Sequence, residues 1–74
     1  MHMTYDREAD AAYVTFGDKI APEEASQQVA FIDTPNGQTQ VTIDVDSEGY
    51  LLGIEILAAS AGLRAEVLNK AQHL

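Results

Sequence analysis

The stretch that decides the fold is QVTIDVDSEGYLLGIEIL at residues 40–57. On either side of Glu48-Gly49, large apolar residues alternate with polar or small ones, a pattern typical of two half-buried β-strands joined by a turn. A two-residue loop at Glu48-Gly49 aligns three apolar pairs: Val45 with Leu52, Ile43 with Ile54, and Val41 with Ile56. These six branched side chains then share one face, and a slip of one residue would expose them to water.

The opposite face of this hairpin carries Thr42, Asp44, Asp46, Gly53 and Glu55, and we expect it to be mostly solvated. In this register Asp44 lies opposite Gly53 and Glu55 opposite Thr42, so the two carboxylates are diagonal neighbours about 7–8 Å apart. The acids also fit an EF-hand calcium loop, but such a loop joins two helices rather than two strands. Asp44, Asp46 and Glu55 are therefore only weak candidates for a Mg²⁺ or Ca²⁺ site.

The sequence predicts five strands in all. Alternation, β-branched residues and aromatic residues place them at residues 2–6, 11–16, 26–33, 40–46 and 50–57. Thr34-Pro35-Asn36-Gly37 is a strong turn signal, so the third strand should fold back on the fourth. Gly17-Asp18-Lys19 predicts a turn after the second strand, and Pro22 is expected to interrupt any strand pairing there.

From Ser60 onwards the apolar period changes to that of a helix. Ser60 is the expected N-cap, and one face of the helix carries Leu63, Val67, Leu68, Ala71 and Leu74. The pattern predicts one amphipathic helix over residues 60–72, covered either by the apolar sheet face or by a partner subunit. The predicted fold is a single α+β domain over residues 1–74, an antiparallel β-meander of four to five strands packed against one C-terminal α-helix.

The composition narrows the classes of partner. The 74 residues include twelve acids and four bases, for a net charge of −8, which repels nucleic acid and anionic lipid. No apolar run is long enough to cross a bilayer, and the N-terminus lacks signal-peptide features, so we expect a cytoplasmic protein. The chain has no cysteine, so packing must stabilise it, and we expect a homodimer interface to contribute to that packing.

The residues offer little for catalysis. His2 and His73 lie near opposite ends without triad spacing, and frayed termini are the expected explanation for both. Glu55 stands between two isoleucines; it either faces solvent or, if buried, pairs with Arg7 or Arg64. We therefore predict no catalytic residue and no cofactor.

Several blocks together resemble a known family. They are Tyr5-Asp6, Glu8-Ala9-Asp10-Ala11, Tyr13-Val14, Asp44-Val45-Asp46, Gly53-Ile54-Glu55-Ile56-Leu57 and Ala59-Ser60. Spread over about residues 4–60, they resemble the small prokaryotic family called domain of unknown function 2283. The resemblance implies a short strand-rich protein without an established activity, and, because some relatives are encoded beside predicted toxins, an antitoxin-like role. The chain departs from the pattern between Val29 and Val41 and beyond Ser60.

Three functions follow as hypotheses. The first is a protein-binding module, acting as a homodimer, that engages a basic protein such as a toxin or nuclease. Its expected contact residues are Asp44, Asp46, Glu55, Leu63 and Val67. The second is a metal-dependent or acid/base enzyme that uses the same three carboxylates, with Tyr5 or Tyr13 orienting the substrate. The third is a purely structural assembly protein.

Overall fold

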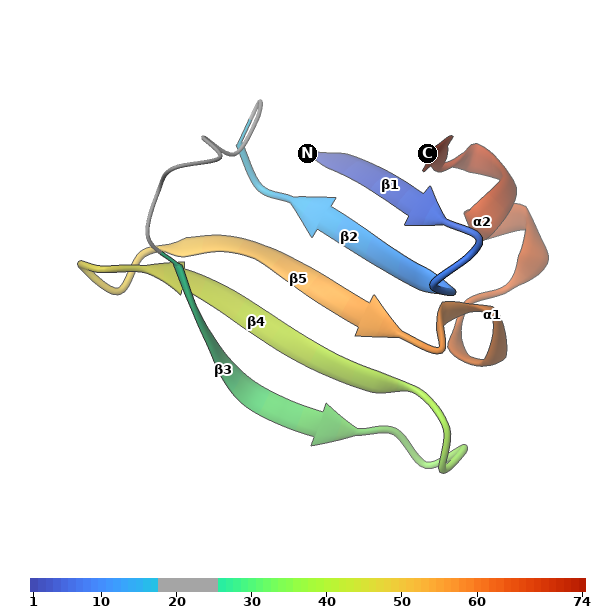
Figure 1. Ribbon diagram of the computed structural model, residues 1–74, viewed down its shortest axis with the longest axis horizontal. Helices are drawn as coiled ribbons and strands as arrows, with labels where there is room; N and C mark the ends of the chain where they lie inside the picture. The colour runs from blue at the N-terminus through green and yellow to red at the C-terminus, as the bar shows by residue number, and fades with distance from the viewer. Residues whose placement is uncertain (18–25) are drawn as a thin grey trace.

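The computed structural model describes residues 1–17 and 26–74, which form a twisted sheet with two short helices at one end (Figure 1). The predicted turn at Gly17-Asp18-Lys19 and the interruption at Pro22 fall largely outside the described residues. The elements are β1 (His2–Asp6), β2 (Ala11–Thr15), β3 (Ser26–Asp33), β4 (Gln40–Asp46), β5 (Leu51–Leu57), α1 (Ala59–Gly62), α2 (Ala65–Lys70) and β6 (Gln72–His73).

The strand order is β3-β4-β5-β2-β1-β6. Neighbouring strands are antiparallel except β1 and β6, which are parallel, so the sheet is mixed. The α+β class is confirmed, but the described residues form six strands rather than four to five. The extra strand joins the C-terminus to β1, and the expected fraying is wrong: His2 pairs with Thr15 and His73 pairs with Tyr5.

The prediction of a single helix over residues 60–72 is also wrong, because the helix is interrupted between α1 and α2. Leu63 is extended, with φ −112° and ψ 140°. Gly62, a poor helix former, lies so close to Thr39 that a Cβ there would be 2.6 Å from the Thr39 Oγ1. Because apolar spacing across the break still resembles one helix, periodicity alone could not reveal it.

The turn between β4 and β5 is one residue longer than predicted. The Asp46 amide donates to the Tyr50 carbonyl at 2.9 Å, which leaves residues 47–49 as a three-residue loop. Gly49 has φ 89°, the left-handed conformation that such loops require at their last position. The Asp46 Oδ1 accepts hydrogen bonds from the amides of Glu48 and Tyr50, both at 2.9 Å, and so fixes this loop.

A β-bulge restores the predicted register immediately after this turn. Val45 pairs with Leu51 rather than with Leu52, which corrects the prediction at that pair. Leu52 is the extra residue, and beyond it the pairs are as predicted: Asp44 with Gly53, Ile43 with Ile54, Thr42 with Glu55, and Val41 with Ile56. The longer loop and the bulge therefore compensate each other, and the isoleucines stay on one face.

The β3–β4 turn is anchored to the helices by its asparagine. Gly37 donates its amide to the Thr34 carbonyl at 3.1 Å, as the turn signal predicts. The Asn36 Oδ1 accepts from the amides of Gln38 and Thr39, while its Nδ2 donates to the Ala61 carbonyl at 3.1 Å. One side chain thus holds both the turn and the first helix.

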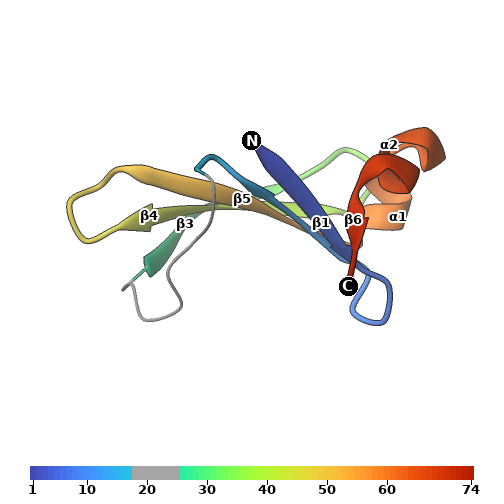
Figure 2. The same ribbon diagram turned by 90° about the horizontal axis from the view of Figure 1, so that it is seen from above.

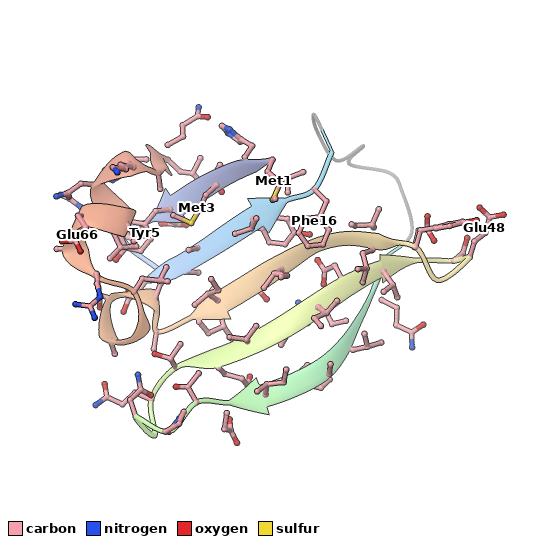
Figure 3. All side chains as sticks on the ribbon, turned by 180° about the vertical axis from the view of Figure 1, so that it is seen from behind. Met1, Met3, Tyr5, Phe16, Glu48 and Glu66 are labelled. Carbon is pink, nitrogen blue, oxygen red and sulfur yellow. The ribbon has the colours of Figure 1, made fainter. Side chains whose placement is uncertain are left out.

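The core is small and lies at one end of the sheet. It consists of Tyr5, Ala12, Ala59 and Ala71, with Met3, Ile56, Leu63 and Leu68 packed around it. The helices stand over that end only, and within the described part of the chain the remaining strands form a single layer without a covering helix (Figure 2). Met3 and Tyr5 lie beside the helices, whereas Glu48 marks the far end (Figure 3). Among the described residues, none of the helices could span a membrane.

The junction between β5 and α1 carries backbone strain that a substitution should relieve. Ala58 has φ 52° and ψ 51°, a conformation that glycine adopts without the steric penalty of a Cβ. Ala58→Gly should therefore raise the free energy of unfolding by about 1 kcal/mol in chemical denaturation. The control Ala61→Gly, inside α1, should lower it by about 1 kcal/mol. A variant at position 58 no more stable than the native chain would contradict this reading of the junction.

Candidate functional site

The strand register separates the side chains of the sheet into two chemically different faces. All five acidic residues in the strands lie on one of them, the acidic face: Asp6, Asp33, Asp44, Asp46 and Glu55. No lysine or arginine lies in a described strand. The three carboxylates selected from the sequence therefore do share a face, as the alternation predicted.

Asp44 is held by a tyrosine that reaches across the intervening strand. The Tyr13 hydroxyl donates to the Asp44 Oδ2 at 2.9 Å, from β2 to β4. Gly53 of β5 lies between them, and a Cβ there would be 2.6 Å from the Tyr13 hydroxyl oxygen. Burial, followed by the hydrogen bond to Asp44, raises the pKa of Tyr13 far above its ordinary value. The Asp44 Oδ1 is buried and accepts no hydrogen bond from the described residues.

Glu55 is also engaged within the chain. The Gln28 Nε2 donates to the Glu55 Oε1 at 2.8 Å and approaches the Thr42 Oγ1 at 3.5 Å. Thr42 beneath them is only 1% exposed, so the expectation of a mostly solvated face is wrong at its centre. The partner of Glu55 is an amide from β3 rather than either of the arginines considered from the sequence.

These contacts give each candidate carboxylate a structural role. Asp44 accepts from Tyr13, Glu55 accepts from Gln28, and Asp46 fixes the β4–β5 loop. Within residues 1–17 and 26–74, no cluster of three or more potential metal ligands is found. Chemically, this face is a network of internal hydrogen bonds.

The two apolar residues predicted to bind a partner lie elsewhere. Leu63 packs against the core cluster on the other side of the sheet, and Val67 on α2 is 37% exposed. The structure therefore does not bring Leu63 and Val67 together with Asp44, Asp46 and Glu55. The predicted contact set is divided between the two faces.

The other side of the sheet is almost purely aliphatic away from the helices. Six of its aliphatic residues are called the apolar face here: Val14, Val29, Val41, Ile43, Val45 and Ile54. Ile32 and the polar Gln27 of β3 also lie on this side. All six residues of the apolar face are only half-buried. In the described part of the chain, the buried apolar residues are one tyrosine and three alanines, and every valine, isoleucine, leucine, phenylalanine and methionine retains exposed surface. An aliphatic face that the other described residues leave uncovered is therefore the feature of the described structure that most suits binding.

A latch between sheet and helix was missed from the sequence. The Asp10 Oδ1 accepts from the Tyr5 hydroxyl at 2.7 Å and from the Ser60 amide at 2.9 Å, and the Asp10 Oδ2 accepts from the Ser60 hydroxyl at 2.7 Å. The Tyr5 hydrogen bond, followed by those from Ser60, lowers the pKa of Asp10. All three residues occur in the blocks that carry the family resemblance. The sequence therefore singled them out, but it did not show that they contact one another.

Comparison with known proteins identifies one family. The family model described as "Protein of unknown function (DUF2283)" matches residues 2–60, which comprise β1 to β5, the latch and the start of α1. No curated protein and no solved structure matched the chain.

The Tyr13 hydrogen bond should contribute measurably to stability. Tyr13→Phe leaves the partly buried Asp44 carboxylate without its donor, which should lower the free energy of unfolding by about 2 kcal/mol. The control Tyr50→Phe changes a side chain that is 70% exposed, and should alter it by less than about 0.5 kcal/mol. Equal effects of the two variants in urea denaturation would contradict the assigned role.

The latch should make stability depend on pH in the acid range. Because the folded state lowers the pKa of Asp10, the latch stabilises the fold above the unfolded pKa of about 3.9 and is lost as pH falls through the folded value. Asp10→Asn, which tolerates the positive φ at this position, should flatten the loss of stability between about pH 5 and pH 2. Ser60→Ala should give an intermediate slope. An unchanged slope in Asp10→Asn would show that other groups govern acid unfolding.

Proposed function

The chain belongs to the DUF2283 family of proteins of unknown function, a membership that fixes no activity, and we propose that it is a protein-binding module whose apolar face is the binding surface. The observation that carries the proposal is the burial pattern. Among the described residues, every valine, isoleucine, leucine, phenylalanine and methionine side chain retains exposed surface.

The physical argument concerns the hydrophobic contribution to folding. Full burial of a valine, leucine or isoleucine side chain stabilises a protein by about 1.5–3 kcal/mol. A chain of this size has little apolar area to bury and no disulfide to compensate. A protein surface placed on the apolar face would complete the burial that the two short helices leave unfinished.

The charge distribution favours a protein as the occupant of this face. The acidic face and the net charge of −8 repel the phosphates of nucleic acid and of anionic lipid. The apolar face itself carries no charged residue among its six members. A sheet face rich in β-branched residues is complementary to another apolar sheet or to an amphipathic helix.

The other hypotheses have weaker support. An enzyme would use Asp44, Asp46 and Glu55, but each of these accepts hydrogen bonds from its own chain. The acidic face suits attraction to a basic protein such as a toxin, which keeps the antitoxin-like role as a narrower version of the proposal. Docking of the C-terminal segment on that partner as one long amphipathic helix is disfavoured, because α2 has only six residues.

Site-specific photo-crosslinking in the producing cell tests this proposal. The two positions lie on the same strand: Ile43 on the apolar face, and Gln40 on the acidic face. A photoreactive phenylalanine analogue at position 43 should give discrete protein adducts, identified by mass spectrometry, whereas the same group at position 40 should give few. No adduct from position 43, or equal adducts from both positions, would contradict the proposal.

A further inference from the structure

We propose that the protein covering the apolar face is a second copy of this chain, packed sheet against sheet with the acidic faces outward. The inference rests on the proposed function, because it identifies the partner of the same surface. The residues that would meet at the interface are Val14, Val29, Val41, Ile43, Val45 and Ile54.

The position of the charges permits this pairing despite a net charge of −8 on each copy. All five acidic strand residues point away from the apolar face, so none would be buried between the two sheets. Stacked sheets lie about 10 Å apart, which separates the two acidic faces by more than the Debye length of about 8 Å at physiological salt. Electrostatic repulsion is therefore largely screened where the copies meet.

The chain exposes more surface than a compact monomer of its mass, and the excess is close to the area that a dimer interface buries. The chain exposes 5161 Å², whereas a compact monomer of 8.0 kDa exposes roughly 4,450 Å². The difference is about 700 Å², close to the roughly 800 Å² that each partner buries in a standard interface. One partner of similar size is sufficient to cover the excess.

The helices determine how two copies can approach. They stand on the same side as the apolar face, because Leu63 and Leu68 pack against the core cluster that includes Tyr5 and Ala12, and they occupy one end of the sheet only. Figure 3 places Glu66 of α2 at that end and Glu48 of the β4–β5 loop at the other. A two-fold axis parallel to the strands would bring the two sets of helices together. An axis perpendicular to the strands instead places each copy's helices beyond the partner's loop, which allows the sheets to touch.

Solution mass tests the pairing with a matched pair of substitutions in β4. Ile43→Lys places a charge on the apolar face, and Gln40→Lys places the same charge on the acidic face. Both variants reduce the net negative charge, so weaker association of one alone cannot come from general repulsion. Light scattering should give twice 8.0 kDa for the native chain and Gln40→Lys, and 8.0 kDa for Ile43→Lys, whose dimer Kd should be raised at least about 100-fold.

Each outcome decides the proposal. If Ile43→Lys loses its β-sheet circular dichroism, Ile43→Thr replaces it, and a folded variant with at least about tenfold weaker association supports the pairing. A native chain that stays monomeric to about 1 mM overturns self-pairing, as does a dimer equally insensitive to both lysines. Crosslinks from position 43 only to an unlike protein would overturn self-pairing and retain the binding module, whereas no crosslinks would reject both.

Discussion

The register between β4 and β5 is the constraint on which the rest of the structure depends. It places Ile43 opposite Ile54 and Asp44 opposite Gly53, and so decides which side of the sheet is aliphatic and which is acidic. The three-residue loop would shift that pairing by one residue, and the bulge at Leu52 reverses the shift. Because strand side chains alternate, an uncorrected shift would have mixed the two chemistries on both faces.

The interior that results from this register is made of small residues. Gly53 leaves room for the Tyr13 ring, Gly62 lets α1 approach Thr39, and the buried apolar residues beside Tyr5 are alanines. Close approach of side chains to glycine backbone therefore replaces the interdigitation of large side chains that most cores use. The hydrogen bonds of Asp10 and Asn36 attach the helices at one end, and they do so without burying the aliphatic side chains at the other.

The local features of the fold could be predicted from the sequence, whereas several nonlocal ones could not. Alternation located β3 and β4 at their observed bounds, and the apolar pairs set the register between β4 and β5. Pairing of β2 with β5 depends on contacts distant in sequence, so the position of Tyr13 over Gly53 was not predictable from periodicity. The break at Gly62 and the strand Gln72–His73 likewise depend on packing against Thr39 and β1.

The same distinction between local and nonlocal features explains why the sequence predicted the shared face of the candidate carboxylates but not their contacts. Clustered carboxylates are conspicuous in a sequence, but in this fold Asp44, Glu55 and Asp46 accept hydrogen bonds from Tyr13, Gln28 and the loop amides, respectively. The alternation predicted the valines and isoleucines as ordinary core residues, because periodicity cannot tell whether a helix will cover them. Polar groups paired within the chain gain little from a partner, whereas half-exposed aliphatic groups gain from every contact that removes water. The surface most suited to binding is therefore the one that the sequence presented as interior.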